Sequence, residues 1–388
     1  SIPISSFKTF TYSIQKNTKF TLFLGQSVVV PFRQKLVDGF IVELGSKTPQ
    51  FKGKILPIHS INDNSFPIKK ELWKTIMWVS KYYICSIGNV LQTALNYQHK
   101  KNYNYAIKKT IRITKLGKQA VESRKIKFTK QREVLTYIYK NNNLEITTLK
   151  KIASSYIQIC NRLQDLRYIQ IVSHNKNNNF FTDNNFNTNN KFRLNNKQKK
   201  IYQSLIKSWD NKINKPALIS GLPGSGKTII YIHLIKSYIK LKKQIIVLVP
   251  EISLIPQTYH MLKEFFPNAV GTWYSKMTLS NRNFVLSELK KNKLSIIVAT
   301  RSGVFFPFEN LGLIIVDEEQ ESSYKQNGRS PYYNARDVAI IRSQFNENKI
   351  ALISSTPSIE SSYTHLKKDF LYYYLDERFY KNKMPKIK

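Results

Sequence analysis

The chain has 388 residues, of which 41% are apolar, and its 62 Lys and Arg against 24 Asp and Glu give a formal net charge of +38. Because a single hydrophobic core stops growing near ~250–300 residues, we expect two or three domains. The longest apolar runs are far shorter than the ~20 residues of a membrane span. Two cysteines, Cys85 and Cys160, support neither a disulfide framework nor a Cys-rich zinc site. We expect both thiols to be buried in a protein of a reducing, cytoplasmic compartment.

The positive charge favours a polyanionic partner, because such a field attracts nucleic acid and makes its binding depend on salt. A second explanation stays open. Lys, Asn, Ile and Tyr are abundant together, as in the products of AT-rich genomes, where mutational bias raises Lys everywhere. Charge therefore indicates nucleic-acid binding without establishing it.

Residues 1–100 predict a small β-rich domain. Short apolar runs indicate strands, and Gly25 and the Pro31-Phe32 pair separate them. A helix is expected over Lys69–Tyr83, where apolar residues recur at helical spacing. The predicted strands are Phe20–Leu24, Ser27–Phe32 and Gly39–Leu44.

Residues 101–126 are basic and Tyr-rich and predict a linker with some strand. Residues 127–172 predict three short helices followed by a strand, the order of a winged helix-turn-helix. Such a module can contact DNA or act as a plain spacer, and both interpretations stay open. Residues 173–190 are Asn-rich and predict a disordered linker. The predicted elements of the winged helix are Thr129–Tyr139, Thr147–Ser154, Ser155–Leu166 and Tyr168–Val172.

Residues 191–388 alternate apolar runs with helical patterns, which predicts a parallel sheet covered on both faces. Ligands of such sheets bind at the carboxyl ends of the strands. The predicted strands are Ala217–Ser220, Gln244–Val249, Ser295–Ala299, Leu313–Val316 and Ile350–Ser354.

The octapeptide Gly221–Thr228, GLPGSGKT, matches G-x-x-x-x-G-K-[ST] between a predicted strand and a predicted helix. Glycines allow backbone N–H groups to approach phosphate oxygens, and a helix N-terminus favours an anion. Lys227 can reach the β- and γ-phosphates, and the Thr228 hydroxyl can ligate Mg²⁺. Gln198 could read the adenine edge, or could be an exposed helix glutamine. The predicted nucleotide-binding residues are Gln198, Gly221, Leu222, Pro223, Gly224, Ser225, Gly226, Lys227 and Thr228.

The strand Leu313–Val316 runs into Asp317-Glu318-Glu319-Gln320. Asp317 and Thr228 would hold Mg²⁺, and Glu318 would orient and deprotonate the attacking water. Lys227, Asp317 and Glu318 are thus the predicted catalytic residues. Three more strand ends carry polar clusters that suit nucleic-acid phosphates, although each alone could be an ordinary loop. They are 250–257, 300–302 and 354–358.

In this order the motifs resemble the bacterial primosomal replication-restart helicases of superfamily 2, the PriA family. The resemblance implies a multidomain α/β protein: a β-rich domain that captures a 3′ DNA end, a winged helix and a RecA-like ATP-binding lobe. It also implies an aromatic-rich loop after Glu319 that senses single-stranded DNA and signals to the ATP site. Tyr324, Tyr332 and Tyr333 could stack on bases there or only pack within the loop. The expected DNA-binding residues are Phe10, Thr11, Gly39, Arg301, Tyr324, Lys325, Tyr333 and Arg336.

The chain departs from the family pattern in three places. Thr11 replaces the usual Asp of the 3′-end pocket, Gln320 replaces His in Asp-Glu-Glu-His, and the loop around Arg329–Asn334 differs. The family continues with a second motor lobe that carries an arginine finger, and with an eight-cysteine zinc module. Zinc is therefore expected only there, and we expect these 388 residues to bind ATP with Mg²⁺ but to hydrolyse it slowly.

These patterns favour an ATP-dependent 3′→5′ DNA helicase that recognises forked DNA and restarts replication by promoting loading of the replicative helicase. Forked or single-stranded DNA is the expected partner. The resemblance adds primosome proteins, single-strand-binding protein and association with the nucleoid; no membrane partner is expected. Two alternatives stay open: a non-hydrolysing, ATP-responsive fork-binding scaffold, and a motor of another branch that acts on RNA or duplex.

Overall fold

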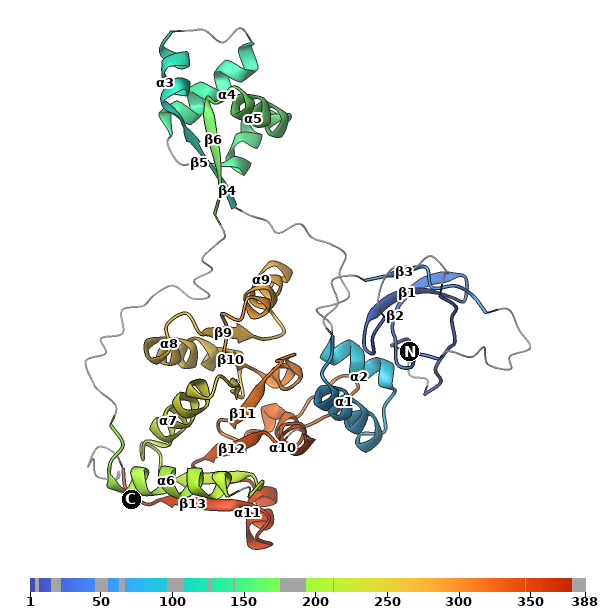
Figure 1. Ribbon diagram of the computed structural model, residues 1–388, viewed down its shortest axis with the longest axis vertical. Helices are drawn as coiled ribbons and strands as arrows, with labels where there is room; N and C mark the ends of the chain where they lie inside the picture. The colour runs from blue at the N-terminus through green and yellow to red at the C-terminus, as the bar shows by residue number, and fades with distance from the viewer. Residues whose placement is uncertain are drawn as a thin grey trace. The chain divides into compact units, whose positions relative to one another are not determined.

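The computed structural model of the chain describes residues 1–3, 7–14, 22–45, 55–62, 67–95, 108–123, 128–141, 144–174, 193–211, 213–345 and 347–378. It divides into two compact units (Figure 1). One joins Ser1–Asn102 to Asn185–Lys388, and the other is Tyr103–Asn184. Within the described ranges, no helix is both long and apolar enough to cross a membrane.

The first unit begins with a small antiparallel sheet of strand order β2-β1-β3. The strands are β1 (Ser27–Phe32), β2 (Lys35–Phe40) and β3 (Ser60–Ile61). The predicted strand Ser27–Phe32 is confirmed, but Gly39–Leu44 is wrong, because β2 begins at Lys35 and ends at Phe40. A two-residue turn with positive φ at Arg33 (45°) and Gln34 (62°) starts β2 early, as hairpin geometry requires.

The other strand predicted for this domain, Phe20–Leu24, is not formed where it can be followed. Leu22 to Leu24 are loop and turn, because Gly25, at φ 80°, reverses the chain there; Phe20 and Thr21 lie outside the described residues. The predicted helix is confirmed as α1 (Lys70–Tyr82), and α2 (Ile87–Ala94) follows it.

The rest of this unit is built on a seven-stranded parallel sheet, counted over the described residues, with strand order β13-β7-β12-β11-β8-β10-β9. Four of the five inner strands are buried along their whole length, and the fifth, Lys349–Ser354, is buried after its first residue, as expected for a sheet covered on both faces. The parallel sheet is confirmed. Its strands are β7 (Ala217–Gly221), β8 (Gln244–Leu248), β9 (Val270–Trp273), β10 (Ile296–Ala299), β11 (Leu311–Val316), β12 (Lys349–Ser354) and β13 (Leu371–Leu375).

Helices alternate with these strands (Figure 1). The helix after β7 packs on β7, β8 and β11, and the one before β12 packs on β11 and β12. The α-helices are α6 (Asn196–Asp210), α7 (Lys227–Lys240), α8 (Ile255–Phe265), α9 (Leu279–Lys290), α10 (Ala335–Phe345) and α11 (Ile359–Leu366), and the 3₁₀ helices are Ile252–Leu254, Arg301–Phe305 and Ser322–Tyr324.

The small N-terminal domain is attached to the large sheet through α1, which packs along α10. Arg342 of α10 is fully buried; it donates to the carbonyl oxygens of Val304 (2.6 Å) and Phe306 (3.0 Å) and lies 3.7 Å from the Glu71 carboxylate of α1. A buried guanidinium that loses an acid partner is costly, so this ion pair favours one docked arrangement.

The second unit has a three-stranded antiparallel sheet of order β5-β4-β6 with helices around one core. Part of the segment predicted as a linker forms β4 and α3, and the predicted helix Thr147–Ser154 is a 3₁₀ turn instead. The winged-helix assignment stays a prediction. The elements are β4 (Lys108–Ile113), α3 (Lys115–Glu122), α4 (Thr129–Lys140), β5 (Leu144–Glu145), 3₁₀ helix Ile146–Lys151, α5 (Tyr156–Asp165) and β6 (Ile169–His174).

Candidate functional site

The sheet order brings the predicted motifs together at one edge. β7, β12 and β11 are neighbours and parallel, so their carboxyl ends lie side by side. The octapeptide Gly221–Thr228 begins at the last residue of β7, Ser354 ends β12 and Ser355 follows it, and Asp317 follows β11. One site can therefore draw on all three strand ends.

The octapeptide forms a turn between β7 and α7, with Gly224 at φ 77° and Gly226 at φ 81°. Both values favour glycine. A Cβ at Gly226 would collide with the Gln198 side-chain amide, whereas a Cβ at Gly224 would meet nothing within 4 Å. The N–H of Ile229 donates to the Gly226 carbonyl (3.0 Å). The N–H groups of Lys227 and Thr228, at the very start of α7, have no acceptor within their own helix and can bind an anion at this turn.

Lys227 begins α7 and folds back into the turn. Its ammonium donates to the carbonyl oxygens of Gly221 (2.8 Å) and Leu222 (3.1 Å) and to Ser355 Oγ (3.0 Å). Burial lowers the pKa of Lys227, while the carboxylates of Glu318 and Asp317 act in the opposite direction. The lysine is thus near both acids and surrounded by weak acceptors that a phosphate could replace.

Gln198 lies beneath this turn with its side chain fully buried. Its amide nitrogen donates to the Ser225 carbonyl (3.0 Å), and its amide oxygen accepts from the Asn195 backbone N–H (2.9 Å), which completes a capping box at the start of α6. The structure therefore places Gln198 as a brace for the turn. Contact with an adenine edge stays a prediction and would require these two bonds to open.

Asp317 and Glu318 follow β11. Burial, followed by the charge of Glu318, raises the pKa of Asp317 to about 6. Glu318 adopts φ 46°, a left-handed conformation that costs a non-glycine residue on the order of 1 kcal/mol or more and is typical of functional sites. Tyr231 of α7 is buried beside them, and burial, followed by the charge of Asp317, raises its pKa.

Gln320 joins this acidic pair to the end of β12. Its amide nitrogen donates to Glu318 Oε2 (2.8 Å), and its amide oxygen accepts from Ser354 Oγ (2.6 Å). A glutamine makes both bonds at once because it carries a donor and an acceptor. Gln320, which stands where the family usually has histidine, thus connects the predicted motif after β11 with the one at the end of β12.

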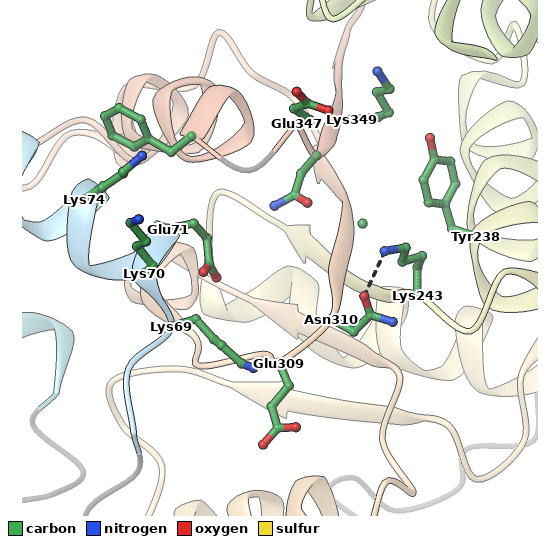
Figure 2. Close-up of a pocket in the computed structure, with 13 residues that line it drawn as sticks. Lys69, Lys70, Glu71, Lys74, Tyr238, Lys243, Glu309, Asn310, Glu347 and Lys349 are labelled. Atoms are coloured by element: carbon green, nitrogen blue, oxygen red, sulfur yellow. Dashed lines mark hydrogen bonds between the residues drawn. The ribbon is translucent and has the colours of Figure 1, made fainter. Parts of the chain in front are cut away.

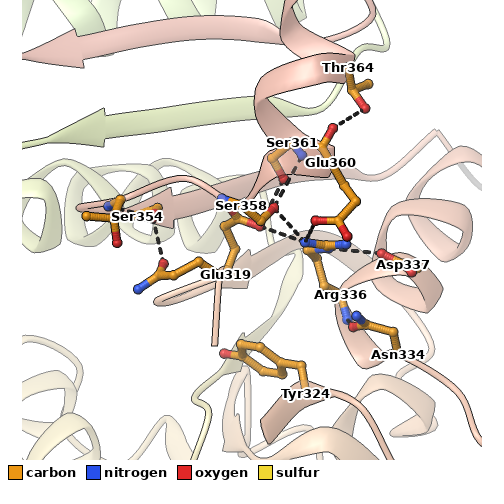
Figure 3. Close-up of polar contacts among 12 residues, drawn as sticks. Glu319, Tyr324, Asn334, Arg336, Asp337, Ser354, Ser358, Glu360, Ser361 and Thr364 are labelled. Carbon is orange, nitrogen blue, oxygen red and sulfur yellow. Dashed lines mark hydrogen bonds and ion pairs between the residues drawn. The ribbon is translucent and has the colours of Figure 1, made fainter. Parts of the chain in front are cut away.

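Glu319 points the other way, into a buried polar network (Figure 3). Its carboxylate accepts from the Ser358 backbone N–H (2.8 Å) and Oγ (3.0 Å), from Ser361 Oγ (2.9 Å) and from the Arg336 guanidinium (3.2 Å). Arg336 also donates to Asp337 (2.9 Å). Arg336 is nearly buried, so the DNA contact predicted for it would require an internal ion pair to open.

The segment 321–334 is the predicted aromatic loop. Tyr324 is fully buried, and its hydroxyl donates to the backbone oxygens of Asp317 (2.6 Å) and Leu248 (3.0 Å). Tyr333 is fully buried too, so neither ring can stack on a base in this conformation, whereas Tyr332 is 52% exposed. The stacking roles stay predictions, and those of the two buried rings require the loop to move.

Two predicted DNA-binding cations lie near this loop. Lys325 is exposed, and its backbone carbonyl accepts from the Arg301 guanidinium (2.7 Å). Arg301 is half-buried at the end of β10. The two side chains therefore come from different strand ends but share one edge of the lobe.

A separate cavity of about 830 Å³ opens in the N-terminal domain. The predicted 3′-end residues Phe10, Thr11 and Gly39 all line it, together with Tyr12 and Glu43. Phe10 packs edge-on against Phe32 at a ring-centroid distance of 5.0 Å. The structure therefore brings these three predicted residues together, away from the octapeptide, in a cavity walled by aromatic and apolar groups.

A second cavity, of about 670 Å³, lies where the start of α1 meets the amino ends of β8, β11 and β12 (Figure 2). It is lined by more lysines than acids, and one of them, Lys243, donates to Asn310 Oδ1 (2.9 Å). Because its strands are parallel, this cavity lies at the edge of the sheet opposite the octapeptide. Its charged lining residues are Lys69, Lys70, Glu71, Lys74, Lys243, Glu309, Glu347 and Lys349.

Sequence reasoning missed two residues of the site, Tyr231 and Glu319. The position of Tyr231, three residues after Thr228 on α7, puts both on one helix face and could have indicated it. Glu319 adjoins the predicted Glu318, but the choice between solvent and a buried network depends on residues that are distant in the chain. No local pattern distinguishes the two outcomes.

Comparison with known proteins adds the family. Residues 1–96 match the 3′DNA-binding domain family, and residues 191–359 match the family described as type III restriction enzyme, res subunit. Together with the parallel sheet, these matches define the class of the chain: a helicase-type lobe preceded by a domain of the 3′DNA-binding type.

Two relatives of the chain are both named replication restart protein PriA. The replication restart protein PriA of Chlamydia muridarum is 30% identical over 96% of this chain and 50% of its own length. The PriA of Haemophilus influenzae is 32% identical over 88% of this chain and 47% of its own length. The chain belongs to the PriA family of replication restart proteins. It spans about half the length of these relatives.

Among solved structures, the chain is similar to one titled as RecG bound to a three-way DNA junction. That similarity has a TM-score of 0.37 at 23% sequence identity and covers 50% of this chain and 25% of the other.

Proposed function

We propose that the protein is an ATP-dependent DNA motor of replication restart: a 3′→5′ helicase that recognises forked DNA and promotes loading of the replicative helicase. The single observation that carries the ATP site is the convergence of Lys227, Asp317 and Glu318 at the carboxyl ends of neighbouring parallel strands. Family membership supports the restart role, and the 830 Å³ cavity supports a site for a DNA end.

The residues at the octapeptide fit a triphosphate. Ser225 Oγ is buried and has no hydrogen-bond partner among the described residues, although a buried hydroxyl normally has one. Lys227 donates to two backbone carbonyls in positions from which it could turn to phosphate oxygens. The glycine turn and the N-terminus of α7 complete a cradle for an anion.

In this proposal, Thr228 and Asp317 hold Mg²⁺, as their hydroxyl and carboxylate oxygens suit a hard cation. Bound Mg²⁺ would neutralise charge on the β- and γ-phosphates. Glu318 orients the attacking water and accepts its proton, and the Gln320 amide fixes the carboxylate for that task. Buried Tyr231 lies close to the Asp317 carboxylate.

The test is ATP turnover with and without forked DNA, measured for the wild-type protein and for Lys227→Ala. DNA-stimulated turnover in the wild type that disappears in the variant would support the proposal. ATP turnover that is unchanged in Lys227→Ala would show that the octapeptide is not the ATP site. Nucleotide binding without turnover would instead favour a non-hydrolysing, ATP-responsive scaffold, and a preference for RNA or blunt duplex would favour another branch of motors.

A further inference from the structure

The cavity of about 670 Å³ gathers positive charge from two sides (Figure 2). Five lysines and three glutamates line it. Lys69, Lys70 and Lys74 stand at the start of α1, on one side of the cavity. Lys243, between α7 and β8, and Lys349, the first residue of β12, lie on the other side. Charges that are far apart in the sequence therefore meet in one cavity.

The acids of the cavity compensate only part of this charge. Glu71 is buried, and its carboxylate lies 3.7 Å from the Arg342 guanidinium, so it already has a cation partner from α10. The other two acids, Glu309 and Glu347, are exposed, and water weakens their field. The cavity thus favours a negatively charged ligand.

The start of α1 goes against an electrostatic rule. Lys69 is the N-cap of α1 and Lys70 its first residue, and no side chain caps this end. A helix N-terminus carries partial positive charge, so a cation destabilises it and an anion stabilises it. Neither ammonium group has an acid partner among the residues that the structure describes. Residues that break such a rule without a local compensation are expected at functional sites.

The lysines of the opposite wall are held in defined positions. The Lys243 ammonium donates to Asn310 Oδ1 (2.9 Å), and its aliphatic stem lies close to Gly312, where a Cβ would come within 2.6 Å of the Lys243 Cβ. Lys349 donates to Asn214 Oδ1 (2.9 Å). An amide oxygen is a neutral acceptor, so the charged oxygen of a phosphate forms a stronger hydrogen bond with either lysine.

We propose that this cavity is an anion site for phosphate groups, separate from the octapeptide. It lies at the amino ends of β8, β11 and β12, whereas the octapeptide begins at the carboxyl end of β7. Lysine is a common phosphate ligand, and the volume of about 670 Å³ falls within the ~300–1,000 Å³ of small-molecule sites. The favoured ligand is a small compound with two or more phosphates. The phosphates of a nucleic-acid strand share this chemistry, and the experiment separates the two sources.

The experiment is a calorimetric titration of the 388-residue chain with sodium pyrophosphate, without Mg²⁺. The chain carries Lys227→Ala, so that the octapeptide contributes little and the outcome does not depend on the proposed ATP site. We expect saturable binding. Lys70→Glu should weaken it about tenfold or more, because a cation of the site becomes an acid. The same substitution should not lower Tm, because an acid in the first turn stabilises a helix. Lys243→Gln, on the opposite wall, should also weaken binding.

Lys115→Glu is the matched control, because mutational bias places lysines at many exposed positions. Lys115 is likewise the exposed first residue of a helix, α3, but it belongs to the other compact unit and does not line the cavity. It should leave the affinity for pyrophosphate within about twofold of the parent chain, since exposed charges outside the site are screened. Absence of saturable binding, or equal affinity in Lys70→Glu and Lys115→Glu, would overturn the proposal.

A fluorescent single-stranded oligonucleotide then identifies the source of the phosphates. If a small polyphosphate is the ligand, the oligonucleotide should bind Lys70→Glu and Lys115→Glu equally, and pyrophosphate should not displace it. If a strand supplies the phosphates, pyrophosphate should displace the oligonucleotide, and only Lys70→Glu should weaken its binding. Both results support the anion site, provided that pyrophosphate binding depends on Lys70.

Discussion

Replacing Glu319 is the sharpest test of the buried network. Glu319→Ala removes the acceptor of four hydrogen bonds and leaves the nearly buried Arg336 without one of its acid partners. Removing one member of a buried ion pair costs about 3–5 kcal/mol. Arg336 keeps Asp337 at 2.9 Å and Ser358 Oγ at 2.7 Å, so the lower end, about 3 kcal/mol, applies. For a lobe of this size, that loss lowers Tm by about 6–12 °C.

The assay is thermal unfolding followed by calorimetry and circular dichroism. Glu321→Ala is the control, because Glu321 lies two residues away and is exposed. It should shift Tm by no more than about 2 °C. Glu319→Gln keeps the shape and part of the hydrogen bonding and should fall between the two. A Glu319→Ala variant that unfolds within about 2 °C of wild type would refute the argument, since the carboxylate would then contribute nothing net to the lobe.

Three further outcomes follow from the geometry. Gly226→Ala should abolish nucleotide binding and destabilise the lobe, because its methyl group would collide with the Gln198 amide. The methyl group of Gly224→Ala meets open space, so that variant should lose only about 1–2 kcal/mol of stability through backbone strain. Equal losses of stability for the two variants in denaturation would argue against the collision with Gln198. Tyr324→Phe removes the hydroxyl that contacts the backbone oxygens of Asp317 and Leu248, of which Leu248 keeps the Asp317 N–H as a donor (2.9 Å), and should cost about 1–2 kcal/mol. Tyr332→Phe should cost almost nothing in the same assay, because that ring is exposed. Burial raises the pKa of Cys160 to about 11, so its thiol should resist Ellman's reagent at pH 8 until the protein unfolds. The pKa of Cys160 is higher in the folded protein than in the unfolded chain, where it is near 9, so the neutral thiol favours the folded state. That contribution to stability is complete below pH 9 and disappears as the pH rises toward 11. A fast reaction of the thiol at pH 8 would contradict the burial of Cys160.

The sequence predicts the large parallel sheet well because its central strands are continuous apolar runs, which are typical of a sheet covered on both faces. The sequence did not predict the edge strand β13, Leu371–Leu375, because its residues alternate between half-buried and exposed, and only Leu375 is buried. The sequence did not predict the turn at Arg33–Gln34 for a different reason. Neither residue is a glycine or asparagine, yet both adopt positive φ, and the hairpin imposes that conformation.

In the candidate site, too, the sequence predicts some residues and not others. Lys227 and Thr228 follow from a local motif whose chemistry depends on consecutive residues. The contact between Tyr83 and Asn334 joins residues 251 positions apart, and the bond between Arg336 and Glu319 depends on where α10 packs. Such pairs are set by tertiary structure, so neither propensity nor spacing along the chain indicates them.

The central claim is that the octapeptide binds the phosphates of ATP. The direct measurement is a titration of the 388-residue chain with a fluorescent ATP analogue and Mg²⁺, compared with Lys227→Ala. We predict saturable binding by the wild type that requires Mg²⁺ and weakens about tenfold or more in the variant, a loss of about 1.4 kcal/mol or greater. Equal affinity in the two proteins would contradict the claim.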